Sequence, residues 1–369
     1  MAQPVAHSDL DGWRGEDVRL GQVLDALAEL RHHRQGGATR ASVTNLVVVS
    51  RHDDEVEQAC DAVHRLGRRH PGRNIVLLAS PGAGPSRIDA EVRLHGSVAE
   101  GHAVWSEDVR LVVQGPLAGH LESLIEPLTL PDLPVAVWFV SGLPDPHDPL
   151  VLAATTVVVD GDTLADATSV AAMARLAARR VVFDLCWERL RPWRQLLAGA
   201  FEVPAARPFL AGVTRVEVEG PQWPSALLGG WAASRLGLPP SAIGRAPAAT
   251  PAIRLVAEHG GQVATFVAEQ AEGAGGTPVV RLVSSLASPG ARPDRLSLPE
   301  DPTAWALGEV LTRSGRDRPG RSVRQAARFG AIPQGWSTGD RVQGQALQAA
   351  VALAGPPPQA EASAGPPAS

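Results

Sequence analysis

The sequence predicts an α/β protein in two parts, an N-terminal layered α/β domain with a largely parallel or mixed sheet and a smaller α+β C-terminal domain with antiparallel strands. Two observations favour this. In the first part, uninterrupted runs of β-branched residues, typical of strands buried on both faces, alternate with stretches of helical apolar spacing. In the second part, apolar stretches flank His259-Gly260-Gly261, which is typical of a hairpin turn.

The elements of the first part follow one another as in a parallel sheet. Asp53 or Asp54 can cap the second helix, and Pro131 and Pro134 precede a strand because proline cannot donate to a ladder. In order, we expect a helix at 18–33, a strand at 45–50, a helix at 53–66, strands at 75–79, 90–98 and 109–115, a helix at 117–126, a strand at 135–140, a helical turn at 150–154, a strand at 156–160 and a helix from 162 to about 180.

The second part begins with an apolar run and a helix that carries Pro192 in its first turn. The further elements expected here are a helix at 192–201, a strand at 213–218, a helix at 225–236, strands at 253–257, 262–268 and 278–283, and helices at 301–311 and 343–353. The chain therefore divides into an N-terminal helical lead at 1–40, the α/β domain at 41–180, the α+β domain at 181–354 and a Pro/Ala/Gly/Ser-rich disordered tail at 355–369.

Composition narrows the class of protein. The chain has 369 residues and a formal net charge of -5, so neither nucleic acid nor an anionic membrane is expected as a partner. The two cysteines are far apart and form no disulfide framework, which favours a reducing compartment. The N-terminus is polar, and no run reaches the ~20 apolar residues of a membrane span. We expect a soluble, cytoplasmic protein.

Motifs for catalysis, cofactors and metals are missing from the sequence. The first strand leads into residues 51–54 without a glycine, and the absence of lysine excludes a Walker motif. Neither HExxH nor GxSxG occurs. Cys186 lies in an apolar run and is interpreted as an inert thiol, whereas His64 lies on an exposed helix face without a convincing set of further ligands. We therefore predict no catalytic residue, no metal site and no cofactor.

Tryptophan is the residue type that stands out in the middle of the chain. Each indole buries a large area and carries an N–H group that needs an acceptor. Two interpretations remain open. These residues can form the junction between the two parts, or Trp187 and Trp193, with Arg191 and Arg194 beside them, can form an exposed Trp/Arg surface that anchors a partner. The four tryptophans of this region are Trp138, Trp187, Trp193 and Trp231.

The same region contains a specific set of motifs: Leu130-Pro131-Asp132-Leu133-Pro134-Val135 with a following Trp138, then Asp184-Leu185-Cys186-Trp187, then Pro192-Trp193-Arg194. With these motifs, residues 44–238 resemble the glucose-6-phosphate dehydrogenase assembly protein family, also called OpcA. The resemblance implies a non-enzymatic partner that promotes the active oligomer of this dehydrogenase in the oxidative pentose phosphate pathway.

Two hypotheses for the functional residues follow. In the first, the chain activates the dehydrogenase by direct contact, and the contacts come from Asp132, Trp187, Arg191, Trp193 and Arg194. In the second, the chain is a sensor or enzyme that binds a sugar phosphate at the carboxyl ends of the α/β strands. The phosphate would then be held by Ser50, Arg51, Ser80 and Arg87.

Overall fold

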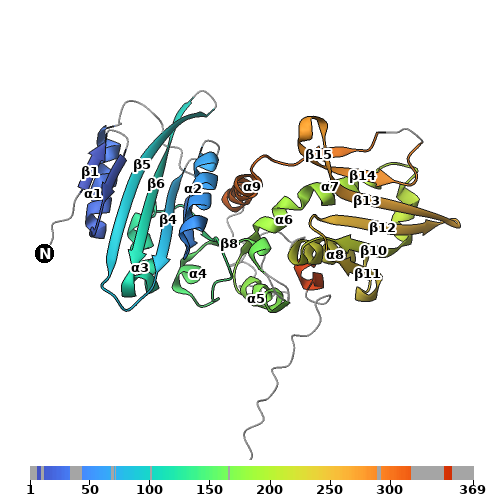
Figure 1. Ribbon diagram of the computed structural model, residues 1–369, viewed down its shortest axis with the longest axis horizontal. Helices are drawn as coiled ribbons and strands as arrows, with labels where there is room; N and C mark the ends of the chain where they lie inside the picture. The colour runs from blue at the N-terminus through green and yellow to red at the C-terminus, as the bar shows by residue number, and fades with distance from the viewer. Residues whose placement is uncertain are drawn as a thin grey trace, which may run out of the picture.

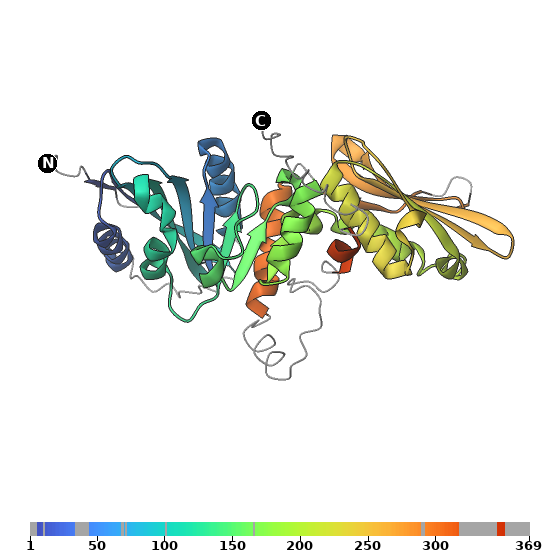
Figure 2. The same ribbon diagram turned by 90° about the horizontal axis from the view of Figure 1, so that it is seen from below.

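The computed structural model describes residues 6–9, 12–33, 44–67, 70, 72–99, 102–164, 167–288, 292–316 and 345–350. These residues form two units, each built on one β-sheet, that lie next to each other along the long axis of the molecule (Figure 1). Seen from below, helices are packed between the two sheets (Figure 2). No helix in the described ranges is both long enough and apolar enough to cross a bilayer.

The first unit contains a nine-stranded mixed sheet in the order β1-β2-β5-β6-β4-β3-β7-β8-β9. From β6 to β9 in this order, each strand is parallel to the next one, whereas the β1–β2, β2–β5 and β5–β6 pairs are antiparallel. The predicted mixed α/β fold class is thereby confirmed. The strands are β1 (Ala6–Asp9), β2 (Gly12–Gly15), β3 (Asn45–Ser50), β4 (Arg73–Ser80), β5 (Arg87–Ala99), β6 (His102–Gln114), β7 (Val135–Phe139), β8 (Thr156–Val159) and β9 (Val182–Asp184).

The central strands of this sheet are buried on both faces. Every residue of β3 is buried, so its β-branched run needs no polar alternation. Val47 packs into the core that includes α1, and Val48 packs into a second core that includes α2. Helices therefore cover both faces of the sheet. The helices of this unit are α1 (Leu20–His33), α2 (Asp53–Gly67), α3 (Leu121–Ile125), α4 (Pro149–Ala153) and α5 (Ala167–Ala177).

A helix from the end of the chain completes the first unit. The apolar face of α9 (Pro302–Arg316) carries Leu307 and Val310, which belong to the same core as α2, Trp138 and Phe183. In Figure 1, α9 lies between α2 and α6, at the side of the first sheet. The chain therefore leaves the first unit after β9, builds the second unit, and returns to cover the first sheet.

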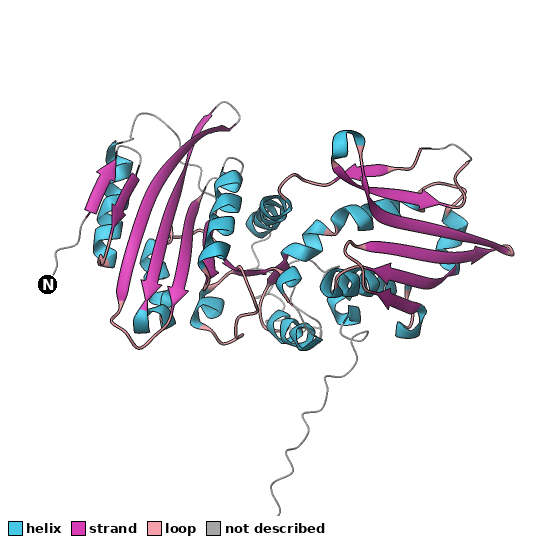
Figure 3. Ribbon diagram, viewed as in Figure 1, coloured by secondary structure: helices cyan, strands magenta, loops and turns pink. Residues whose placement is uncertain are grey.

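The second unit contains a six-stranded sheet in the order β11-β10-β12-β13-β14-β15 (Figure 3). Only β10 and β11 pair in parallel; the other pairs are antiparallel. The helices α7 and α8 pack on one face of the sheet. The elements are α6 (Leu185–Arg189), α7 (Arg191–Ala200), β10 (Val213–Glu219), α8 (Gln222–Leu236), β11 (Ile243–Ala246), β12 (Ala252–His259), β13 (Gln262–Glu272), β14 (Pro278–Ser284) and β15 (Arg295–Ser297).

The structure corrects two of the predicted boundaries. Residues 1–40 were expected to be a helical lead. Instead, β2 pairs with β5 and β1 pairs with β2, so both strands extend the first sheet. The division after residue 180 would place β9 in the second unit, whereas β9 pairs with β8. A short apolar strand next to a helix carries no sequence signal for the sheet that it joins. The predicted tail at 355–369 lies outside the described residues.

A buried ion-pair network ties the amino end of the first sheet together. Arg73 begins β4, and both its Nε and its Nη2 donate to Oε2 of Glu107 on β6, at 2.8 and 2.6 Å. Arg31 of α1 donates to the other oxygen of Glu107 at 2.7 Å. Arg73 also donates to the backbone oxygen of Leu128. Glu107 thus links α1 to the sheet through two arginines.

We predict that Glu107→Gln lowers the free energy of unfolding by about 3–5 kcal/mol, because the substitution leaves Arg73 as a buried charge without its carboxylate. Denaturant titration measures this change. Glu122→Gln is the matched control, since Glu122 is more exposed and lies 3.9 Å from His120. A Glu107→Gln protein as stable as this control would contradict the assignment.

Candidate functional site

The loop at residues 130–134 is held rigidly by a buried amide. It precedes β7 at the amino end of the parallel strands. The side chain of Asn45, the first residue of β3, accepts a hydrogen bond from Leu130 N at 2.7 Å and donates to Leu130 O at 3.0 Å. The backbone N–H of Asn45 donates to Pro134 O at 2.9 Å. Both ends of the loop are therefore fixed to the neighbouring strand.

Asp132 lies exposed at the tip of this loop, and its backbone adopts the left-handed conformation, with φ = 65°. Aspartate tolerates this region better than most residues, but the conformation still costs free energy relative to the usual one. Such conformations persist where the surroundings over-determine them, and they cluster at functional sites. Of the predicted partner-binding residues, Asp132 is the one that is exposed to solvent.

The predicted Trp/Arg surface is not formed. Trp187 is 0% exposed and Trp193 is 4% exposed. The indole N–H of Trp193 donates to Pro251 O at 2.9 Å. Arg194 stacks over the ring of Trp187, with 3.4 Å from Cζ to the ring centroid, and donates to its backbone oxygen at 2.9 Å. These residues pack at the junction between the two units, as the other interpretation of the tryptophans predicts.

Arg191 also acts at this junction. Its guanidinium donates to Glu188, which is buried, at 2.6 Å and to Glu309 of α9 at 2.8 Å. It also lies over the ring of Trp305, 5.1 Å from the centroid. Arg313 of α9 forms a second ion pair with Glu188. The charges that were predicted to face a partner therefore connect α9 to α6 and α7.

The residues predicted to bind phosphate share one edge of the first sheet but do not form a cationic site. Ser50 ends β3, and its hydroxyl donates to Glu55 at 2.6 Å; Ser141 donates to the same carboxylate at 2.9 Å. Arg87 begins β5 and donates to Asp89 at 2.9 Å. Arg51 and Ser80 are exposed at this edge. Glu55 and Asp89 place negative charge where a phosphate would have to bind.

The same edge contains the point where the strand order reverses, which is the usual ligand position in open α/β sheets. Strand β4 lies on one side of β3, and β7 lies on the other. The helix that follows β3 is α2, and its first turn carries Asp53, Asp54 and Glu55. A helix N-terminus attracts anions, but here three carboxylates already occupy the first turn. The geometry disfavours a nucleotide or sugar phosphate at this edge.

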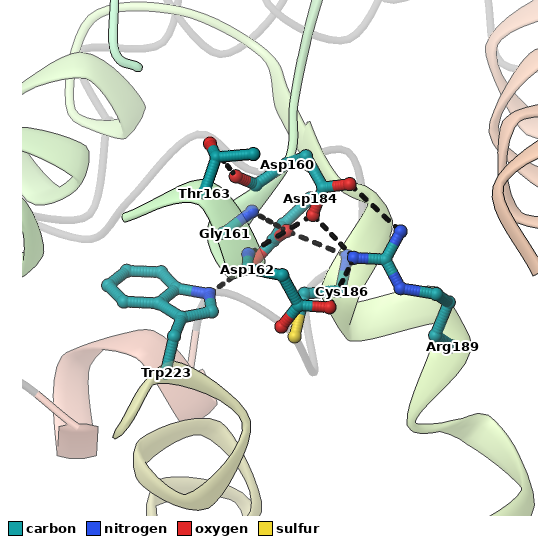
Figure 4. Close-up of polar contacts among 8 residues, drawn as sticks. All are labelled: Asp160, Gly161, Asp162, Thr163, Asp184, Cys186, Arg189 and Trp223. Atoms are coloured by element: carbon teal, nitrogen blue, oxygen red, sulfur yellow. Dashed lines mark hydrogen bonds and ion pairs between the residues drawn. The ribbon is translucent and has the colours of Figure 1, made fainter. Parts of the chain in front are cut away.

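A second polar cluster lies at the carboxyl ends of β8 and β9 (Figure 4). Asp184, which is 1% exposed, ends β9 and accepts hydrogen bonds from Gly161 N and Cys186 N, both at 2.9 Å. Its other oxygen accepts from the indole N–H of Trp223 in α8 at 2.7 Å. A Cβ at Gly161 would lie 1.8 Å from that indole nitrogen, so glycine is required. Asp184 thus connects the segment at Gly161 in the first unit to α6 and α8 in the second unit.

Burial and nearby charges set the protonation of this cluster. Desolvation, followed by the negative charge of Asp160, raises the pKa of Asp184 to about 7. Arg189 donates to Asp160 at 2.9 Å and to Asp162 at 2.6 Å and so neutralises part of the acidic group. Burial also raises the pKa of the Cys186 thiol well above its usual value, which agrees with the predicted inert cysteine.

A cavity of about 180 Å³ adjoins this cluster between the two units. Its walls are largely apolar, and the polar groups at its border are already paired with each other. Lining residues include Cys186, Arg189, Trp193, Pro251, Pro299 and Pro302. The Cys186 thiol has a raised pKa and Arg189 is held in ion pairs, so neither of these two lining residues is an activated nucleophile or base.

Sequence reasoning did not single out Asn45, Glu55 or Arg189. Only Asp184 carried a usable local signal, because an aspartate between an apolar run and a helix is a typical N-cap, and its side chain does accept from Cys186 N. The partners of Asn45 and Arg189 lie far away in the chain, and Glu55 binds the distant Ser141 as well as the nearby Ser50. Their roles follow from strand pairing, which no local spacing reveals.

We predict that Asp184 makes stability depend on pH. Between about pH 4 and pH 7, the folded protein holds a proton on Asp184 that the unfolded chain has released, so the free energy of unfolding falls as pH rises through this window. In Asp184→Asn this contribution is absent. When denaturation is measured at pH 5 and again at pH 8, the free energy of unfolding of the variant, relative to that of wild type, should rise by on the order of 2 kcal/mol between the two pH values.

The change between the two pH values, and not the stability at either one, tests this prediction, because Asp184→Asn also loses the bond from Trp223 at every pH. Asp294→Asn, which replaces an exposed carboxylate, is the matched control. If wild type and Asp184→Asn changed in parallel with pH, the raised pKa would be wrong.

Comparison with known proteins adds family evidence to this geometry. Residues 63–178 match the family model described as the glucose-6-phosphate dehydrogenase subunit N-terminal domain, and residues 180–321 match the model of the C-terminal domain of that subunit. A comparison of the sequence with curated proteins finds no match.

Solved structures give only distant similarities. A mutant of the 3-ketoreductase KijD10 from Actinomadura kijaniata is 11% identical, with a TM-score of 0.39 over 84% of this chain and 95% of that one. An oxidoreductase from Thermotoga maritima is 10% identical, with a TM-score of 0.33 over 85% and 97%. At these identities and TM-scores, the two structures support no statement about the fold or the function of this chain. The two family models together span most of the chain, and the chain therefore belongs to the OpcA family of glucose-6-phosphate dehydrogenase assembly proteins.

Proposed function

We propose that this chain is a non-enzymatic assembly factor that activates glucose-6-phosphate dehydrogenase, an enzyme of the oxidative pentose phosphate pathway, by protein–protein contact. Family membership supports the choice of partner. The observation that carries the non-enzymatic part is the pairing of the polar groups at the strand ends. Ser50 and Ser141 donate to Glu55, and Arg189 pairs with Asp160 and Asp162. Neither of these hydrogen-bonded sets contains the serine–histidine or cysteine–histidine pair that usually activates a nucleophile.

Activation by contact requires a difference in affinity between two states of the enzyme. A partner that binds the active oligomer and the inactive form equally well shifts nothing, however tightly it binds. A tenfold preference for the active oligomer corresponds to about 1.4 kcal/mol, which a few well-placed contacts can supply. Catalysis by the chain itself is not needed for this effect.

The loop at residues 130–134 is the best-supported contact. Its prolines and the Asn45 side chain hold it in one conformation, so little conformational entropy is lost when it docks. Asp132 places an exposed negative charge at its tip. An arginine or lysine on the dehydrogenase is the complementary group. Trp187, Trp193 and Arg194 are buried or stacked at the junction and act by supporting the two units instead of touching the partner.

The sugar-phosphate sensor that was considered as an alternative has less support. The acceptor Glu55 and the carboxylate Asp89 engage two of the four residues proposed to bind the phosphate. Both carboxylates would repel a phosphate dianion at close range. No second function is therefore put forward.

We expect the purified chain, added to glucose-6-phosphate dehydrogenase from the same organism, to raise the turnover rate of the enzyme and to shift it to a larger oligomer. Enzyme assays together with light scattering measure both effects. The chain alone should not oxidise glucose 6-phosphate. An unchanged rate and size of the dehydrogenase would refute the proposal, as would turnover by the chain without the enzyme.

We further predict that Asp132→Asn raises the concentration needed for half-maximal activation by about tenfold, which corresponds to one lost charge-assisted contact. Asparagine also tolerates the left-handed backbone, so the loop keeps its shape and only the charge changes. Asp294→Asn removes an exposed charge from the second unit and serves as control. Equal activation by both variants would exclude Asp132 while leaving the assembly function intact.

A further inference from the structure

Three potential metal ligands from three different elements converge on one face of the first sheet. His64 lies in the last turn of α2, His95 lies on β5 and Asp108 lies on β6. The ligand atoms of these three residues all lie within 4.8 Å of one another. None of the three contributes to the apolar cores, and none belongs to the groups described above.

Strand pairing explains why they meet. In the antiparallel β5–β6 pair, His95 lies opposite Ser106, and Asp108 is two residues further along β6. Residues two apart on a strand share a face, so His95 and Asp108 are diagonal neighbours. Helix α2 packs against β4, next to β6, and brings His64 to the same place. Sequence spacing cannot reveal this set, because its members are far apart in the chain.

The distances suit a small cation. His95 Nε2 and Asp108 Oδ2 are 3.1 Å apart. The rings of His64 and His95 meet edge to face, with 5.0 Å between centroids and an interplanar angle of 80°. Ligand atoms bound at roughly 2.0–2.2 Å to one tetrahedral ion lie roughly 3.3–3.6 Å apart. The His95–Asp108 pair is already close to that spacing, and a small side-chain rotation of His64, which is exposed, closes the set.

A neighbouring amide orients the carboxylate. Asn74 lies directly opposite Asp108 in the parallel β4–β6 pair, and its Nδ2 donates to Asp108 Oδ1 at 2.7 Å. This leaves Oδ2 turned toward His95. Hydrogen bonds of this kind to a ligating carboxylate are typical of metal sites, where they fix the position of the ligand. Asn74 itself is buried, so the orientation is well defined.

We propose that His64, His95 and Asp108 bind one divalent transition-metal ion, with Zn²⁺ as the best match. Two imidazole nitrogens and one carboxylate oxygen are a ligand set that zinc accepts, and three protein ligands leave a fourth position for water. The hard cations Ca²⁺ and Mg²⁺ prefer oxygen ligands and fit this set poorly. The ion would connect the end of α2 to the β5–β6 hairpin.

Two further groups border the site. Cys60 precedes His64 by one helical turn and lies on the same side of α2. Burial raises the pKa of its thiol, and Arg110 and Asp108 both act on it. The sulfur of Cys60 is not one of the converging ligand atoms, which belong to the two histidines and the aspartate. The positive charge of Arg110 opposes cation binding here, so the affinity has to come from the two imidazoles and Asp108.

The test is equilibrium dialysis of the full chain, without a histidine tag, against Zn²⁺. We expect one equivalent bound per chain and a higher melting temperature with the metal. His64→Ala and His95→Ala should each weaken binding by at least about tenfold. Replacement with Co²⁺ provides a second measurement, because coordination by imidazole produces a visible absorption band that should disappear in both variants.

The control is His120→Ala, which removes an exposed histidine on α3's N-terminal side and should leave Zn²⁺ binding unchanged. Circular dichroism checks that each variant is folded. Absence of Zn²⁺ binding by the wild type would overturn the proposal. Binding that survives in both His64→Ala and His95→Ala, or that falls equally in His120→Ala, would show adventitious histidine binding and overturn it as well.

Discussion

The carboxylate of Asp184 is the interaction on which the arrangement of the two units depends. It is buried, and three donors from separate segments converge on it: the backbone at Gly161, the backbone at Cys186 and the indole of Trp223. One side chain thereby ends β9, starts α6 and holds α8 of the second unit. An unpaired buried acceptor is costly, so loss of any one donor would weaken both units together.

Helix α9 forms the other half of the connection. Its apolar residues cover the first sheet, while Glu309 and Arg313 pair with Arg191 and Glu188 at the start of the second unit. The ion pairs surround Glu188, which is buried and needs compensating charge. The junction is therefore partly apolar and partly ionic, and it requires segments that lie more than a hundred residues apart in the chain.

Much of the fold could be predicted from sequence, because its strongest signals are local. The β-branched run of β3 and the hairpin at Gly260 were recognised from residue type and spacing alone. The position of β9 could not be, since three apolar residues do not reveal which sheet they join. Trp187 and Trp193 were ambiguous for a related reason. A tryptophan and an arginine that lie close together in the sequence can face a partner or stack on each other within the protein, and the sequence is the same in both cases.

The return of α9 has a consequence for how the molecule is made. During synthesis the strands of the first sheet leave the ribosome early, but the helix that covers Trp138 and Phe183 emerges more than a hundred residues later. Until then, part of one sheet face stays open to water, and the second unit must fold while its neighbour is unfinished. Docking of α9 is therefore the closing step of the domain that began first.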